Sequence, residues 1–169
     1  MRNEKWLNFL WEEFIVDFLD FYDAFLQEAQ KVYRYNPDIP MQYRIVALLN
    51  REYEYNTAKR FMEANRDYFQ DKYMYLLLDS AIELCFDIVI DGEGTLYQDI
   101  KDLPKEHIYK PTPETLDYIE FLLQNGANPY LPEDFNQFEH IDELMEDASQ
   151  QIGCQFNCSE VKELLKKYS

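Results

Sequence analysis

Carboxylates are the one abundant reactive group in this sequence of 169 residues, which holds 33 Asp and Glu side chains but only 16 Lys and Arg. Glu13, Asp17 and Asp20 stand at i, i+4 and i+7 of a predicted helix, so they share one face where a divalent ion could bridge them. The same spacing is typical of the solvated stripe on a mostly buried helix, and no EF-hand pattern accompanies it. We therefore rank a carboxylate-dependent metal hydrolase last among three functional hypotheses.

Histidine and cysteine offer little further chemistry. His107 and His140 fall in a predicted loop and on a polar helix face, outside the H-E-x-x-H and Glu-x-x-His spacings, and are predicted to be surface residues. Cys158 stands at a predicted helix start, where the dipole could lower the pKa of its thiol, but no histidine pairs with it. Nucleophile-elbow, Walker A, dinucleotide and C-x-x-C signatures are all absent from the sequence. We expect no enzymatic activity, no catalytic residues, no cofactor and no metal site.

The acidic residues are concentrated in the second part of the sequence. Residues 1–70 hold nine basic and twelve acidic side chains, whereas residues 71–169 hold seven basic and twenty-one acidic ones. A general bias toward solubility would spread acid over the whole chain. We therefore predict a partner-binding surface, and its residues are Glu133, Asp134, Glu139, Asp142, Glu143, Glu146 and Asp147.

Four of these residues form a ridge on one predicted helix. Steps of three and four residues link Glu139, Asp142, Glu143 and Glu146, so neighbouring carboxylates repel each other by about 0.2–0.5 kcal/mol per pair. Folding alone does not require this repulsion. If the ridge pairs internally, however, the charge asymmetry is a structural device, and the candidate partners are Arg44, Arg51, Arg60 and Arg66.

The net charge of −17 restricts the kind of partner. Phosphate repulsion disfavours direct binding of nucleic acid and of anionic membranes. A basic protein is favoured instead. The region from Tyr33 to Tyr75 interleaves tyrosines with arginines, and an aromatic rim on a helical core is its default explanation.

Periodicity and breakers predict an all-α fold. Expected helices run over 4–33, 41–53, from Asn56 or Thr57 to 70, over 72–90, from Thr112 to Asn125, and from starts near Asn136 and Asn157. The end of the fourth, CFDIVI, could instead form a short strand. Residues 91–110 show no sustained period and are predicted to be a loop, with one turn of helix near 98–102. Thr112 is the expected N-cap of the next helix, and Gly126 the left-handed residue that ends it.

The helix after Thr112 and the following N-G-A-N-P resemble the second helix and exit loop of an ankyrin repeat. On that resemblance residues 137–148 and 160–167 stand for a closing repeat, and residues 75–85 for the first helix of the preceding one. The pairs Leu122–Leu123 and Leu164–Leu165 lie 42 residues apart, which is longer than the ankyrin period of about 33 residues. The resemblance is therefore to one or two degenerate units, and it implies ankyrin-like α-solenoid packing in the C-terminal half of an irregular helical array.

These observations predict a single domain over 1–169, with aromatic-rich helices in 1–90, a loop in 91–110 and acidic ankyrin-like helices in 111–169. Three unpaired cysteines and the absence of a sufficiently long apolar run indicate a cytoplasmic protein. The favoured function is an acidic protein-binding module that inhibits or neutralises a basic partner, such as an immunity protein against a nuclease-type toxin. The alternative is a DNA mimic of the anti-restriction or anti-CRISPR type. The sequence does not predict the oligomeric state.

Overall fold

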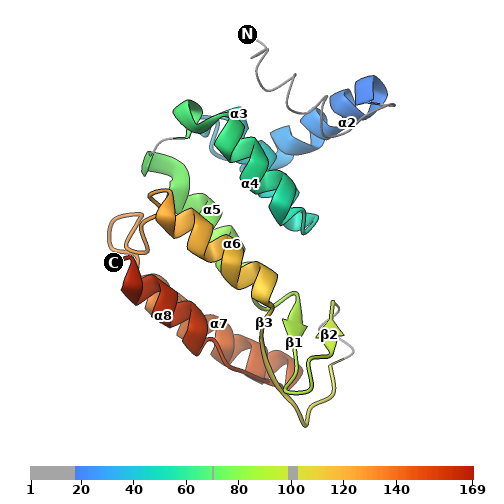
Figure 1. Ribbon diagram of the computed structural model, residues 1–169, viewed down its shortest axis with the longest axis vertical. Coiled ribbons are helices and arrows are strands. Elements are labelled where there is room, and N and C mark those ends of the chain that lie inside the picture. The colour runs from blue at the N-terminus through green and yellow to red at the C-terminus, as the bar shows by residue number, and fades with distance from the viewer. Residues whose placement is uncertain (1–17, 70, 99–102) are drawn as a thin grey trace. The chain divides into compact units, whose positions relative to one another are not determined.

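The computed structural model describes residues 18–69, 71–98 and 103–169, which form seven α-helices, a short 3-10 helix and four strands (Figure 1). The chain divides into two compact units, residues 1–77 and residues 78–169, and the boundary falls within helix α5 (Asp71–Leu84). The grouping of the whole chain into one domain stays a prediction.

The first unit is helical in its described part. It contains α2 (Phe18–Lys31), α3 (Met41–Arg51), α4 (Tyr55–Ala64), the 3-10 helix η1 (Arg66–Tyr68) and the first turns of α5. The predicted long N-terminal helix is confirmed over α2, and its first residues lie outside the described chain. Buried apolar side chains from three helices and the α2–α3 connection form the core, including Ala29, Val32, Ile45, Val46, Ala58 and Phe61.

Arg44 organises the connection between α2 and α3. Its side chain is buried, with 7% of the residue exposed. The guanidinium donates to the carbonyl oxygens of Gln30 at 3.2 Å, Asn36 at 2.7 Å and Ile39 at 2.9 Å, and also to that of Val32. These carbonyls lie at the end of α2 and in the turn that follows it, where no hydrogen bond within a helix can satisfy them. The guanidinium of Arg44, which belongs to α3, supplies the missing donors.

The second unit is not all-helical, and the predicted all-α fold is wrong there. It contains β1 (Val89–Ile90), β2 (Leu96–Tyr97), β3 (Ile108–Pro111), α6 (Pro113–Gln124), α7 (Gln137–Ile152), β4 (Gln155–Phe156) and α8 (Ser159–Lys167). The sheet order is β2-β1-β3-β4, with β1 antiparallel to both neighbours and β3 parallel to β4. Strands of two to four residues are too short for an alternating pattern to identify them.

Residues 91–110, predicted as a loop, supply much of this sheet. The buried carboxylate of Asp91 accepts from the backbone N–H groups of Glu93 and Thr95, both at 2.9 Å, and so closes the turn between β1 and β2. Tyr109 of β3 is fully buried with Val89 and Cys154. The helix predicted over 72–90 ends at Leu84, and the alternative of a short strand at the end of CFDIVI is confirmed as β1. The turn of helix proposed near 98–102 falls mainly on residues outside the described chain.

Local signals placed the C-terminal helices correctly. The Thr112 side chain accepts from the N–H of Thr115 at 3.2 Å and caps α6, and Gly126 follows that helix with a φ of 98°. Asn136 caps α7 by accepting from the N–H of Phe138 at 2.9 Å. These caps are confirmed because each depends on residues within one turn of the helix end.

The C-terminal helices bury most of the apolar residues expected of them. Helix α6 packs against α8, and α7 packs against β4. Ile119, Leu122, Ile141 and Val161 are buried as predicted, whereas Leu144 and Leu164 are only half-buried. The ankyrin-like arrangement of these helices stays a prediction. No helix in the described part of the chain combines the length and apolar character needed to cross a membrane.

Candidate functional site

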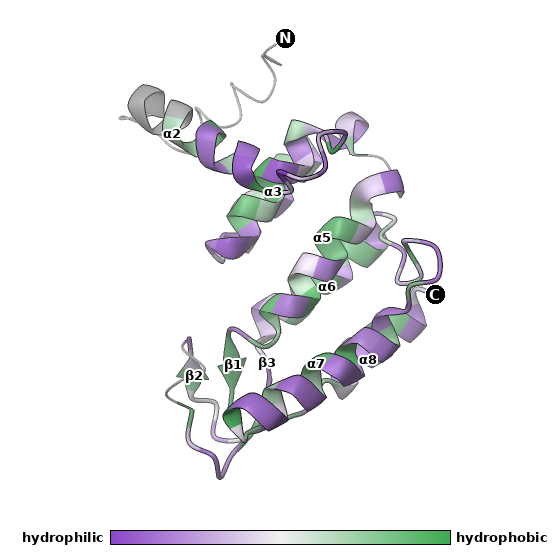
Figure 2. Cartoon of the chain, turned by 180° about the vertical axis from the view of Figure 1, so that it is seen from behind, coloured by the Kyte–Doolittle hydropathy of each residue, from purple (hydrophilic) through white to green (hydrophobic). Residues whose placement is uncertain are grey.

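The seven carboxylates predicted to bind a partner are all exposed. Five of them stand on α7 and two in the preceding loop, and we call them together the acidic face: Glu133, Asp134, Glu139, Asp142, Glu143, Glu146 and Asp147. The opposite side of α7 is apolar, because Ile141 is buried and Leu144, Met145 and Ala148 are half-buried. Hydrophilic segments run along α7 and α8, whereas much of α5 is hydrophobic (Figure 2). The amphipathic pattern of α7 therefore directs its carboxylates into solvent.

Few cations of the described chain neutralise the acidic face. Lys162 of α8 forms an ion pair with Asp142, and the His140 Nδ1 lies 4.0 Å from a Glu143 oxygen. Glu146 accepts a hydrogen bond from Gln150 at 3.1 Å. Within the described residues, the other four carboxylates of the face have no ion pair. Arg44, considered above as an internal partner, is instead engaged by backbone carbonyls of the first unit.

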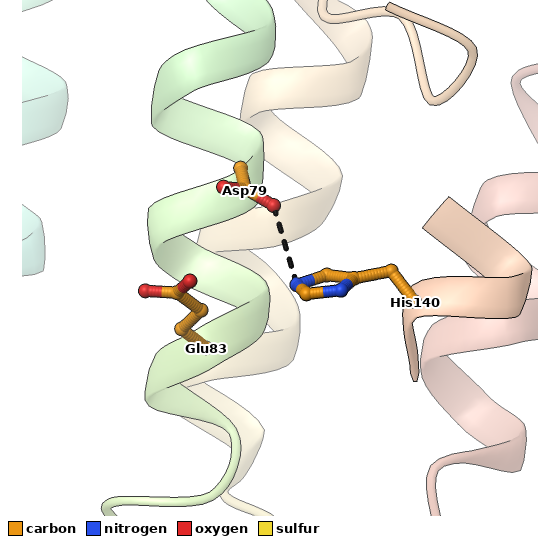
Figure 3. Close-up of side chains that lie close together, drawn as sticks. All are labelled: Asp79, Glu83 and His140. Atoms are coloured by element: carbon orange, nitrogen blue, oxygen red, sulfur yellow. Dashed lines mark ion pairs between the residues drawn. The ribbon is translucent and has the colours of Figure 1, made fainter. Parts of the chain in front are cut away.

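A second cluster combines residues that sequence spacing did not connect. Asp79 and Glu83 lie one turn apart on α5, and the imidazole of His140 extends from α7 toward them (Figure 3). One ligand atom from each of the three residues lies within 4.8 Å of the others. His140 was predicted to be a surface residue, but only 22% of its side chain is exposed. The i, i+4 pair on α5 was the only local signal for this cluster.

The other histidine belongs to the sheet. The Nδ1 of His107 lies 3.4 Å from the Asp91 carboxylate, and the Tyr97 hydroxyl donates to the same carboxylate at 3.3 Å. Hydrogen bonds from the backbone N–H groups of Thr95 and Glu93 hold the pKa of Asp91 below its usual value, with smaller contributions from Tyr97 and His107. This arrangement stabilises the β1–β2 turn and leaves His107 half-buried.

None of the three cysteines is an activated nucleophile. Cys85, Cys154 and Cys158 are free thiols and all are buried. Burial raises the pKa of Cys158 to about 12, although Lys162 nearby acts in the opposite direction. The helix dipole, which could have lowered this pKa, has the smaller effect because the thiol is withdrawn from water.

A groove of about 470 Å³ lies over α6 and α8. Leu116 and Leu164 give it an apolar lining, while Glu120 and Lys167 form an ion pair of 2.7 Å across it. Hydrogen bonds from Lys167 and then from the Tyr168 hydroxyl lower the pKa of Glu120. These contacts connect the end of α8 to α6, which makes the charged groups here part of the helix packing.

The chain matches no family model, no curated protein and no solved structure. Of the carboxylates considered for a metal hydrolase, Glu13 and Asp17 lie outside the described residues, as does the side chain of Asp20. Among the residues that the structure describes, the acidic face and the cluster of Asp79, Glu83 and His140 are the candidate sites carried further.

Proposed function

We propose that this protein is an acidic protein-binding module that occupies a basic surface on a partner protein and thereby inhibits or neutralises it. An immunity protein against a nuclease-type toxin is the concrete form of this proposal. The observation that carries it is the exposure of all seven carboxylates of the acidic face with a single lysine partner among the described residues. A cytoplasmic setting and ankyrin-like helix pairing belong to the same proposal.

Unneutralised carboxylates on one helix face produce a local negative potential. Such a potential attracts a basic partner during diffusion, raises the association rate and selects against acidic partners. The basic residues of a nuclease surface, which otherwise contact phosphates, have the complementary charge. The face thus needs no chemistry of its own, because covering the partner is sufficient to block it.

The dimensions of α7 support a compact inhibitor over a DNA mimic. From Glu139 to Asp147 the helix advances about 12 Å, at about 1.5 Å per residue. A DNA duplex covers only three to four base pairs in about that length, at about 3.4 Å per base pair. A mimic of a long DNA path would need carboxylates over a greater distance than α7 supplies.

The test compares association rates after charge reversal. The double variant Glu146→Lys, Asp147→Lys alters the acidic face without touching the Asp142–Lys162 ion pair. The full-length wild type is immobilised and used to capture partners from the source cell, and each purified partner is then measured against the variant. We expect the association rate at low ionic strength to fall by about tenfold, with a smaller difference in high salt.

The matched control is the double variant Glu52→Lys, Glu63→Lys, which makes the same charge change at exposed positions of the first unit. It should associate at nearly the wild-type rate. If the partner is a nuclease, its activity should be blocked by the wild type and by the control. Equal association rates for wild type and α7 variant would show that the face is only solvated, and capture of an intact DNA-processing complex would favour the mimic.

A further inference from the structure

The side chains of Asp79, Glu83 and His140 form a second site that is independent of the acidic-face proposal. We propose that these three residues bind one divalent transition-metal ion of the Zn²⁺ class, which bridges α5 and α7. The ligands would be a carboxylate oxygen of Asp79, a carboxylate oxygen of Glu83 and the Nε2 of His140. All three residues belong to the second unit.

Helix geometry brings the ligands together. Residues four apart on a helix stand one above the other on the same face, so Asp79 and Glu83 present two carboxylates side by side. Across from them, the His140 Nε2 lies 3.6 Å from the Asp79 Oδ1 (Figure 3). Gln137, one turn before His140 on α7, donates to that same oxygen at 3.0 Å and fixes the Asp79 carboxylate.

Two buried polar atoms at this place lack a partner. The His140 Nε2 is buried without a hydrogen bond, since 3.6 Å to Asp79 exceeds hydrogen-bond length. The Oε1 of Gln137 is also buried without a partner, and only 1% of that residue is exposed. The amide nitrogen of Gln137 contacts Asp79. The unpartnered oxygen belongs to the same amide group and therefore lies beside the site. Native proteins rarely leave such atoms unsatisfied, and a bound ion would satisfy the imidazole directly.

The spacing fits a small tetrahedral ion. Zinc binds histidine nitrogen and carboxylate oxygen at about 2.0–2.2 Å, which places neighbouring ligand atoms about 3.4 Å apart. The His140–Asp79 pair is already at 3.6 Å. Glu83 is exposed, and one of its carboxylate oxygens already lies within 4.8 Å of the other two ligand atoms. Three protein ligands leave the fourth position for water.

The donor set selects the type of ion. A nitrogen ligand disfavours Mg²⁺ and Ca²⁺, which prefer oxygen ligands in larger numbers. Two carboxylates and a neutral imidazole balance the charge of a divalent transition ion.

The surroundings of His140 resemble the outer shell of a metal site. A Glu143 oxygen lies 4.0 Å from the Nδ1, the nitrogen that faces away from Asp79. Histidines that bind metals commonly have a carboxylate near their other ring nitrogen, and Glu143 stands on that side of His140. The Phe135 ring lies 5.4 Å from the imidazole and restricts its orientation. Asp79 is 36% exposed at its side chain, so an ion can reach the site from solvent.

The test is calorimetric titration of the full-length protein, purified with a chelator and then dialysed, using ZnCl₂ as the probe. We expect saturable binding of one Zn²⁺ per chain and a higher thermal midpoint in its presence, since an ion that binds only the folded state stabilises it. His140→Gln and Glu83→Gln should each weaken binding by at least tenfold. Glu83→Gln changes an exposed side chain, so its effect can be measured even if the histidine variant is destabilised.

Two matched controls make the same chemical changes elsewhere. His107→Gln removes the other histidine, and Glu93→Gln neutralises an exposed glutamate of the β1–β2 turn. Both should bind Zn²⁺ like the wild type. With Co²⁺ as a second probe, visible absorption typical of four-coordinate cobalt should appear in the wild type and be lost in Glu83→Gln. Absence of saturable binding would overturn the proposal, as would an equal loss of affinity in His107→Gln and His140→Gln.

Discussion

Arg44 in the first unit and the acidic face of the second unit show two opposite uses of charge. The Arg44 guanidinium is buried and donates to four backbone carbonyl oxygens, whereas the carboxylates of α7 are exposed and mostly lack ion pairs within the described chain. A buried charge is retained when its hydrogen bonds hold the local structure. An exposed, unneutralised charge contributes little to folding and is available to a partner. Under the proposed function, stability depends on the first kind of charge and recognition on the second.

The largest effect should follow from removing the buried charge. We expect Arg44→Met to lower the free energy of unfolding by about 3 kcal/mol or more, because several buried carbonyls lose their donor at a cost of about 1–3 kcal/mol each. Urea unfolding followed by circular dichroism measures the change. Arg51→Met at the exposed end of α3 is the control, with an expected change within about 0.5 kcal/mol. Equal effects of the two substitutions would show that the carbonyl oxygens around Arg44 accept hydrogen bonds from water when the guanidinium is absent.

A smaller effect on stability should come from Asp91, which is a buried carboxylate within the second unit. Its pKa is lowered in the folded protein, chiefly by the N–H of Thr95. Its contribution to stability is therefore complete above the ordinary carboxyl pKa of about 3.9 and is lost as the pH falls through the lowered folded value. We expect Asp91→Asn to reduce the decline in unfolding free energy below about pH 4. Glu93→Gln in the same turn is the control and should keep the decline seen in wild type. If the unfolding free energy of Asp91→Asn declines as steeply as that of wild type, Asp91 is not the group responsible for the decline.

The smallest effect should come from the exposed charges. We expect Glu146→Lys, Asp147→Lys to leave the free energy of unfolding unchanged or slightly raised, by about 0.2–0.5 kcal/mol for each like-charge pair removed. The gain should shrink in high salt. Thermal unfolding at two salt concentrations measures it. A loss above about 1 kcal/mol would show that the face supports the fold, and the comparison with Arg44 would then fail.

The sequence predicted best what depends on residues close together in the chain. The caps at Thr112 and Asn136 and the end at Gly126 are local, and all are present. The sheet was missed because its strands are short and are defined by pairing with distant segments. Ile108 pairs with Gln155, for example, and nothing in the four residues of β3 indicates that partner.

The sites follow the same division. Exposure of the acidic face could be expected from the helical spacing of its carboxylates and of the apolar residues opposite. The proximity of His140 to Asp79 could not, because it depends on how α7 packs beside α5. The burial of Cys158 could not be predicted from neighbouring residues either. Its position beside a helix start favours a low pKa, but withdrawal from solvent has the larger effect and raises the pKa.

The parallel pairing of β3 with β4 has a consequence for the folding kinetics of the second unit. The pairing joins Ile108 to Gln155 and Tyr109 to Phe156, and the Asn157 N–H extends it by donating to the Tyr109 carbonyl at 2.7 Å. The chain between these strands contains both α6 and α7. Closing so long a loop before its helices form loses much conformational entropy for very few hydrogen bonds. Helices α6 and α7 should therefore form early, and β4 should join the sheet in the last and slowest step.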